Sequence, residues 1–183
     1  MKSNAVTVRV RLEESMFRKF ALFDTFVLGK RWKLPTYFAL ILVGFSLVCL
    51  FSGKDESWLV GGLLMLIGLG MPAVYVFTFL YQVKQKARLF GLKTPKAMYT
   101  VTLTGNNVNI HNDYKSEPEV TLSWDKLFGA VRVKDAIYLY AVRARAFILP
   151  DGQADAEPDE VWALIGRMLP PEKRSDKRRK RMK

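Results

Sequence analysis

The sequence predicts an α+β membrane protein, in which a two-helix transmembrane hairpin accompanies a small antiparallel-sheet domain with a C-terminal helix. Three observations predict this fold class. Two apolar runs without any charged side chain stand close together at residues 36–51 and 58–83. Short segments of alternating polarity follow them, and an amphipathic segment at residues 158–169 closes the series. Segregated charge is typical of membrane proteins, and period-two alternation is typical of half-buried strands.

The overall composition hides the difference between the uncharged apolar runs and the charged segments around them. The chain has 183 residues, half of them hydrophobic and a quarter charged, which suits one domain or a small domain with membrane anchors. The formal net charge of +12 comes from 29 cations and 17 carboxylates, with the excess at the two ends of the chain. Cys49 is the single cysteine, so an intramolecular disulfide or a cysteine-rich zinc site is excluded.

The first 33 residues are expected to form a strand and an amphipathic helix. Residues 5–12 alternate strictly, and a lone strand is unstable, so its partner must come from the C-terminal half. Residues 13–27 then show an aromatic stripe at helical spacing, which includes Phe17, Phe20 and Phe23. We expect this helix to pack on the C-terminal domain, with the lipid interface as the alternative.

Residues 34–90 are expected to form the hairpin, with spans at residues 35–53 and 58–83. The first run is near the lower limit for a spanning helix, and the second is longer than the hydrocarbon core requires. Gly61 and Gly68 stand two turns apart and would allow close approach of the first helix. Neither run holds an Asp, Glu, Lys, Arg or His, which argues against a transporter, a channel or a proton path. An oligomer lined by Ser and Thr is the alternative that this observation leaves open.

The flanking charges predict the topology. Cations precede the first run and follow the second, whereas the intervening turn is weakly acidic. The flanking cations are Lys30, Arg31, Lys33, Lys84, Lys86 and Arg88, and the turn carries Lys54, Asp55 and Glu56. The positive-inside rule therefore places both termini in the cytoplasm and the turn outside.

Residues 97–170 are expected to form the sheet domain. Strands are predicted at residues 98–103, 108–112, 120–124, 128–134, 137–141 and 145–149. Short strands at this spacing indicate an antiparallel sheet or barrel. Pro158 opens the amphipathic helix at its first turn, and Pro170 and Pro171 stop it.

Six strands followed by a helix resemble the pleckstrin-homology-like fold. Most of the chain, up to about Leu169, resembles the YcxB-like family of bacterial membrane proteins. The resemblance rests on the residues of segments 7–14 and 17–20, the paired apolar runs, and segments 122–140 and 146–150. It implies two membrane helices inserted between an N-terminal strand and helix and a cytoplasmic sheet domain, in the bacterial inner membrane. It implies no established activity or catalytic residues.

Residues 171–183 are expected to be a disordered basic tail, because charge density of this kind prevents a packed core. Such a tail can contact anionic lipid beside the inner leaflet. The expected lipid contacts are Lys173, Arg174, Lys177, Arg178, Arg179, Lys180, Arg181 and Lys183. A solvated tail that only helps to fix topology is the main alternative, and nucleic acid is the weaker one.

Residues with catalytic or metal-binding chemistry are sparse. His111, the single histidine, falls on the strand face opposite Ile110, and no spacing proposes a nucleophile for it. The acidic stretch 151–160 lacks the order of a calcium loop and is expected to be a solvated loop and helix start. We therefore expect no catalytic, cofactor-binding or metal site, and no enzyme.

A basic group is conceivable on the sheet domain, from Arg132 and Lys134 on one strand with Arg143 and Arg145 near another. In soluble pleckstrin-homology domains such groups can face phosphoinositides, although bacteria generally offer other anionic lipids. Exposed strand faces without a ligand are the favoured alternative.

Together these patterns predict a membrane-anchored cytoplasmic binding or scaffold module of the bacterial inner membrane, without a reaction of its own. The alternative is an accessory subunit of a transport or envelope-stress membrane assembly, in which the hairpin pairs with a larger partner. The expected partners are the lipid bilayer, anionic headgroups through the tail, and an unidentified protein.

Overall fold

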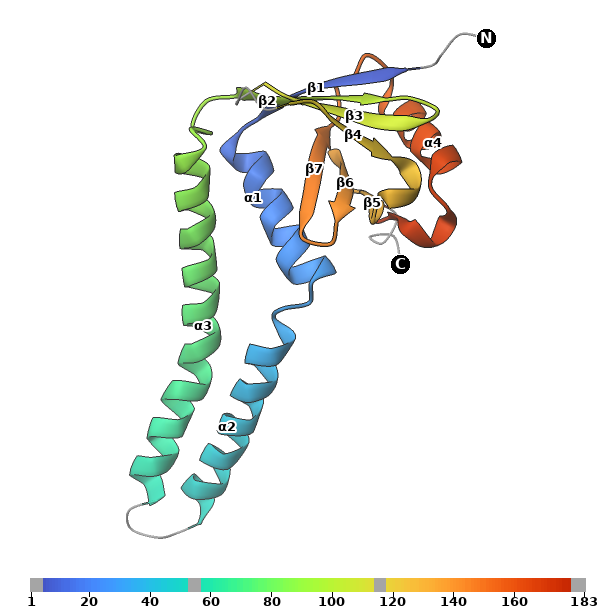
Figure 1. Cartoon of the computed structure of the whole chain (residues 1–183). Coiled ribbons are helices and arrows are strands. Elements are labelled where there is room, and N and C mark those ends of the chain that lie inside the picture. Colours follow the sequence, from blue (N-terminus) through green and yellow to red (C-terminus); the bar gives the residue numbers. More distant parts are fainter. Residues whose placement is uncertain (1–4, 53–56, 114–117, 179–183) are drawn as a thin grey trace. The chain divides into compact units, whose positions relative to one another are not determined.

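The computed structural model describes residues 5–52, 57–113 and 118–178 (Figure 1). The chain divides into two compact units. The sheet unit comprises Met1–Glu13 and Thr94–Lys183, and the helical unit comprises Glu14–Lys93. The helical unit is therefore an insertion within the sequence of the sheet unit.

The first sheet of the sheet unit is antiparallel and has the strand order β1-β2-β3-β4. Its strands are β1 (Val6–Leu12), β2 (Lys96–Leu103), β3 (Asn107–Asn112) and β4 (Val120–Ser123). Val6 lies opposite Leu103, and Leu12 lies opposite Lys96. The prediction that the N-terminal strand pairs with the C-terminal half is confirmed.

The second sheet has the order β7-β6-β5-β8. Its strands are β5 (Gly129–Arg132), β6 (Ala136–Val142), β7 (Arg145–Pro150) and β8 (Arg174–Asp176). β8 runs parallel to β5, whereas the other pairs are antiparallel. The remaining elements of the unit are the helix α4 (Pro158–Met168) and the 3₁₀ turns η2 (Trp124–Lys126) and η3 (Pro171–Lys173). The six predicted strands and the helix are confirmed, and β8 is an addition to them.

The core of the sheet unit follows from the alternation of its strands. Every second residue of β1 is buried, and the same period recurs at the ends of β2 and in β3. Buried side chains of the two sheets and α4 include Val8, Val10, Val101, Leu103, Val108, Leu127, Ile137, Leu139, Ile165 and Leu169. Hydrophobic burial on this scale is the main stabilising contribution to such a fold.

A tyrosine joins the two sheets. The Tyr99 hydroxyl of β2 donates to the Ile148 carbonyl of β7 at 3.1 Å and accepts from the Ile148 N–H at 2.8 Å. The Tyr99 ring also meets Phe147 edge to face at 5.4 Å. Burial raises the pKa of the Tyr99 phenol far above its usual value, because the charged form would lose its hydration.

The free edge of β1 is covered by part of the acidic stretch. The Arg9 N–H donates to the Gln153 carbonyl at 3.2 Å, and the Asp155 N–H donates to the Thr7 carbonyl at 3.0 Å. The Asp155 carboxylate accepts the Thr7 N–H at 2.8 Å. This part of the stretch, expected to be a solvated loop, pairs with a strand because an exposed edge leaves backbone groups unpaired.

The helical unit contains four helical elements. They are α1 (Glu14–Leu22), the π-helix η1 (Phe23–Leu28), α2 (Lys33–Phe51) and α3 (Ser57–Leu89). Gly91, with a φ of 70°, ends α3 in the left-handed conformation that its sequence predicts. The two apolar helices have mean hydropathies of 2.2 and 2.1, and both are long and apolar enough to cross a membrane.

The aromatic stripe of α1 and η1 packs along the C-terminal part of α3. Phe17 meets Phe90 at 6.1 Å between ring centroids, and Phe26 meets Tyr75 at 6.3 Å and Phe79 at 5.1 Å. The expectation placed this stripe on the sheet domain, whereas these rings contact residues of the helical unit. The helix α3 has 33 residues and α2 has 19, so α2 cannot pack along the whole of α3. The C-terminal part of α3 is therefore available to cover the stripe.

Candidate functional site

The two apolar helices approach closely at two glycines. A Cβ added to Gly61 would meet the Leu50 side chain at 2.7 Å, and one added to Gly68 would meet the Leu42 Cβ at 3.2 Å. Both distances are shorter than ordinary van der Waals contact. The prediction that Gly61 and Gly68 face the first helix is confirmed, since larger residues there would separate the helices.

A buried serine strengthens this contact. Ser46 of α2 has no exposed area, and its Oγ donates to the Gly61 carbonyl of α3 at 2.7 Å. Small residues and hydroxyl bonds of this kind join helices where no hydrophobic force between them is available. The hairpin is thus held by packing and one interhelical hydrogen bond at the Gly61 level.

The outer surface of the hairpin is apolar and exposed. Large exposed side chains on it include Leu34, Leu40, Phe45, Val48, Phe51, Leu63, Leu66, Leu69, Val74 and Phe77. Gly44, Gly62 and Gly70 face open space on this surface. An apolar surface of this extent is typical of a membrane or protein contact rather than of a water-exposed helix pair.

Polar and aromatic residues mark one end of the hairpin. Trp32 is exposed just before α2, and its neighbours Lys30 and Arg31 are exposed as well. Lys30 has a φ of 48°, so the helical backbone is interrupted between η1 and α2. Lys84 and Arg88 are exposed in the last turns of α3. Tryptophan and cations together are typical of a headgroup-level boundary.

The C-terminal tail is ordered further than its charge predicts. The Lys173 ammonium donates to the Asp125 carbonyl at 2.8 Å and to the Leu127 carbonyl at 3.0 Å. The Arg174 guanidinium donates to the Gly166 carbonyl at 2.7 Å, in the last turn of α4. A cation is favoured at a helix C-terminus, so both side chains stabilise the sheet unit.

Arg178 extends this order by two ion pairs. Its guanidinium binds the Asp176 carboxylate at 2.9 Å and the Asp159 carboxylate at 2.7 Å. The hydrogen bond from Arg178 holds the pKa of Asp176 below its usual value. The prediction that residues 171–183 are disordered is therefore wrong for residues 171–178, because these cations have partners. Arg179, Lys180, Arg181 and Lys183 lie outside the described residues.

The conceivable basic group on the sheet domain is not assembled, and the favoured alternative of exposed strand faces is wrong for Arg132, which is buried. Arg132 is 3% exposed, and its guanidinium binds both oxygens of the Asp151 carboxylate, one of them at 2.9 Å. Arg132 lies opposite Ile137 at one end of β6. Arg143 and Arg145 belong to the turn at the other end of β6, where Val142 lies opposite Arg145. Arg132 and the neighbouring Lys134 therefore lie at the opposite end of β6 from Arg143 and Arg145.

His111 and the acidic residues form no metal site within the described part of the chain. The His111 side chain is 59% exposed, and its Nε2 lies 3.8 Å from the Asp113 carboxylate. Residues 5–52, 57–113 and 118–178 contain no group of three side chains that could hold a metal ion.

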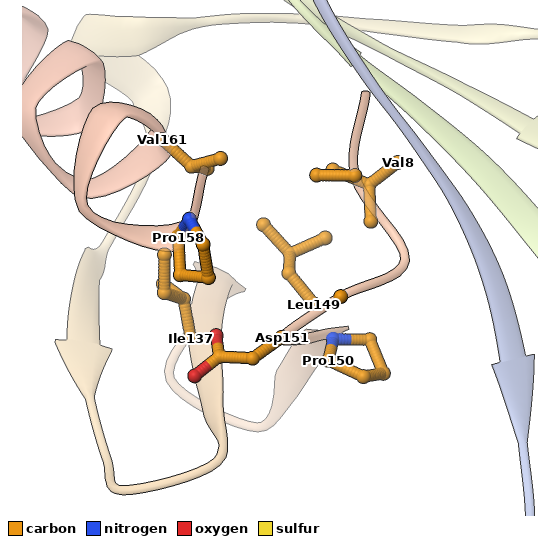
Figure 2. A pocket seen from close by; sticks show the side chains of 9 residues that line it. Val8, Ile137, Leu149, Pro150, Asp151, Pro158 and Val161 are labelled. Carbon is orange, nitrogen blue, oxygen red and sulfur yellow. The ribbon is translucent and has the colours of Figure 1, made fainter. Parts of the chain in front are cut away.

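A small pocket lies between β1, the second sheet and α4 (Figure 2). Its volume is about 220 Å³ including the solvent at its mouth, which is below the usual size of ligand sites. Val8, Ile137, Leu149 and Val161 give it an apolar lining. The Asp151 carboxylate at its rim is already bound to Arg132, so the pocket offers little polar recognition.

Two exposed apolar side chains at one end of the second sheet escaped the sequence reasoning. Phe128 is 50% exposed and Val142 is 57% exposed. Val142 directly precedes Arg143 in the β6–β7 turn. A large apolar residue beside cations in a turn is a signal that could have drawn attention to this end.

Searches against protein-family models, curated proteins and solved structures return no match. The resemblance to the YcxB-like family therefore stays a prediction from the sequence.

Proposed function

We propose that the chain is a membrane-anchored binding or scaffold module, without a reaction of its own. In this proposal α2 and α3 span the bacterial inner membrane, and the sheet unit lies in the cytoplasm. One observation carries the proposal. β1 and β2 are adjacent antiparallel strands, so the chain leaves the sheet at Leu12 and returns to it opposite, at Lys96. Both ends of the inserted hairpin must therefore lie on the same side of a membrane.

The exposure of the apolar helices supports membrane insertion over a soluble core. Only Ala39 and Ser46 of α2 are buried, and α3 has four buried residues, two of them in its final turns. A core helix of a soluble protein would be covered by its own chain. A cleaved signal sequence is disfavoured as well, because β1 precedes the first apolar helix and pairs with β2.

The cytoplasmic side is proposed from the flanking charges. Lys30 and Arg31 precede α2, and Lys33 is its first residue. Lys84 and Arg88 lie near the end of α3. An excess of Lys and Arg in short flanks marks the cytoplasmic side. The proposed contact of the tail with anionic lipid falls on Lys177 and on the cations that follow Arg178, because Lys173, Arg174 and Arg178 have internal partners.

The sheet unit is proposed to be pleckstrin-homology-like. The order of the elements supports this proposal, because four strands of one sheet are followed by three antiparallel strands of the second sheet and then by the helix α4. β8 is an addition to this outline. The inferred role is binding, since a fold alone does not determine function. The unit presents exposed basic and apolar residues at its surface, including Phe128 and Arg143.

Alkaline carbonate extraction of membranes tests the anchoring. We expect the full chain to stay in the membrane pellet, as an integral protein does. Release into the supernatant, with a peripheral protein as the comparison, would refute the bilayer-spanning hairpin.

An accessory subunit of a larger membrane assembly is the second candidate function. The open glycines Gly62 and Gly70 favour it, because they would let another helix approach α3 closely. A photo-crosslinker at Leu66 on the hairpin, and in a separate variant at Phe128 on the sheet unit, distinguishes the two roles in native membranes. A protein adduct from Leu66 alone supports the subunit, and one from Phe128 alone supports the scaffold.

A further inference from the structure

Two exposed apolar side chains of the sheet unit, Phe128 and Val142, lie at one end of its second sheet, whereas Val120 belongs to β4 of the first sheet. Within the described residues of this unit, the large exposed hydrophobic side chains are Val120, Phe128 and Val142. Phe128 immediately precedes β5, and its N–H donates to the Tyr140 carbonyl of β6 at 2.9 Å. Val142 follows two residues after Tyr140. Phe128 and Val142 therefore stand at the same end of the β5–β6 pair.

Exposed cations surround these two side chains in the sequence. Lys126 ends η2, two residues before Phe128. Arg143 and Arg145 lie in and beside the β6–β7 turn that follows Val142. All three cations are exposed. Asp125 is the one carboxylate within segments 125–129 and 141–146, so this end of the sheet carries a net positive charge.

The opposite end of the same sheet gathers carboxylates. Asp135 lies in the β5–β6 turn, and the Asp151 N–H donates to the Asp135 carbonyl at 3.1 Å. Asp176 of β8 lies beside Arg132, the last residue of β5. Cations offset the carboxylates at this end, since Asp151 binds Arg132 and Asp176 binds Arg178. The Phe128 end, with three exposed cations and one carboxylate in its segments, is the end with an excess of one sign.

We propose that the basic and apolar end, formed by Lys126, Phe128, Val142, Arg143 and Arg145, contacts the anionic surface of the bilayer that holds the hairpin. This inference rests on the proposed function. The arginines bind lipid phosphates, since a guanidinium matches phosphate oxygens bidentately. Phe128 and Val142 enter the headgroup layer, where apolar side chains beside cations are stabilised.

Charge complementarity selects the bilayer as the occupant. The inner leaflet of a membrane is anionic, and the three cations meet it with the right sign. Two apolar side chains are few for a protein interface, which usually buries about 1,200–2,000 Å² in total. The covalent link to the hairpin also keeps the sheet unit at high effective concentration beside this surface.

A fluorescence measurement on the full chain in nanodiscs tests the proposal. The Cys49→Ser background receives Ala144→Cys, at an exposed position of the β6–β7 turn, and an environment-sensitive dye. The discs contain phosphatidylcholine alone or with phosphatidylglycerol, and both include nitroxide-labelled lipid. We expect a blue shift and stronger quenching in the anionic discs, and a loss of both at high salt.

Charge reversal provides the matched comparison. Arg143→Glu with Arg145→Glu should abolish the dependence on phosphatidylglycerol. Lys134→Glu, an exposed cation beyond the opposite end of β5, should preserve it. Phe128→Ser should reduce quenching in the anionic discs. Equal emission and quenching of the parent protein in both lipids, or loss of the effect in Lys134→Glu alone, would overturn the inference.

A second label separates this inference from the proposed function. Leu66→Cys places the dye on the outer surface of the hairpin, where the side chain is 71% exposed. Quenching of this dye by the nitroxide lipid in both discs reports insertion of the hairpin. If the Leu66 position is quenched and the Ala144 position is indifferent to lipid charge, only the surface contact fails. If the Leu66 position is unquenched, the membrane anchor itself fails.

Discussion

At the scale of single residues, the Arg132–Asp151 pair shows how a cation that looked available for ligands is used inside the fold. The Arg132 guanidinium is buried and binds Asp151 through two hydrogen bonds. A buried charge without its partner costs far more than an exposed one. The sequence around Arg132 does not reveal this partner. Arg132 ends β5, whereas Asp151 follows β7, so the two residues meet only through the pairing of the strands.

Asp151→Ala should lower the free energy of unfolding of the sheet unit by about 3–5 kcal/mol, because it leaves the buried Arg132 cation unpaired. Urea unfolding of the full chain in detergent micelles measures this change. Lys134→Ala, at an exposed cation near the same end of the sheet, should change it by less than about 0.5 kcal/mol. Equal effects of the two substitutions would contradict the buried pair.

Tyr138 predicts an alkaline limit of stability. Burial, and then the Asp135 carboxylate, raise the pKa of Tyr138 from its usual value of 10.0 to about 12. The folded state thus holds the phenolic proton more tightly than the unfolded state. The resulting stability is complete below pH 10 and is lost as the pH rises toward 12. Between pH 10 and 12, the free energy of unfolding of the Tyr138→Phe variant should therefore fall by about 1–3 kcal/mol less than that of the parent protein. Urea unfolding across this pH range tests it, and identical slopes would contradict it.

At the scale of elements, β8 adds a strand that charge density alone does not predict. Gly129 lies so close to the Lys173 carbonyl that an added Cβ would collide with it. Gly129→Ala should therefore destabilise the sheet unit by about 1–3 kcal/mol. Gly105→Ala is the matched control, since nothing lies within 4 Å of the added atom there. Urea unfolding distinguishes them, and an equal response would mean that β8 does not pair with β5.

The hairpin offers a second matched pair of adjacent glycines. Gly61→Leu should weaken the α2–α3 contact by several kcal/mol, because Leu50 and the Ser46 carbonyl occupy the space of the new side chain. Gly62→Leu faces open space and should have little effect on the contact. Unfolding by a titration with sodium dodecyl sulfate, followed by circular dichroism, compares the two. A larger effect from Gly62→Leu would place the helix contact on another face.

At the scale of the whole molecule, the predictable features are those with a local period. The strands from β2 to β7, the helix α4 and the two apolar helices follow from alternation, spacing and hydropathy. The pairing of β1 with a strand of the C-terminal half was predictable because a lone strand needs a partner, although the pattern did not specify β2. The ordered tail was not, because Lys173 and Arg178 find partners far away in the sequence. The split of the basic group likewise depends on strand register, which a sequence pattern leaves open.

The organisation of the chain explains why the hairpin carries few polar groups. Because β1 and β2 are paired, the chain inserted between them must return to the sheet that it left. The helices α2 and α3 allow this return, and small residues and a hydroxyl at Ser46, Gly61 and Gly68 hold them together without charged side chains. The chemistry available for binding then lies in the sheet unit. Its charged and apolar surface is where a contact with a ligand or with lipid headgroups is expected, whereas the hairpin is proposed to lie in the bilayer.

In the proposed topology, the hairpin crosses the bilayer while both of its ends, and the sheet unit, remain in the cytoplasm. Cysteine accessibility in intact cells tests it most directly, in the Cys49→Ser background with a membrane-impermeant maleimide. We expect Asp55→Cys, in the turn between the apolar runs, to react in intact cells. Asn106→Cys, at an exposed turn of the sheet unit, should react only after permeabilisation. Reaction of Asn106→Cys in intact cells, or protection of Asp55→Cys until permeabilisation, would contradict the claim.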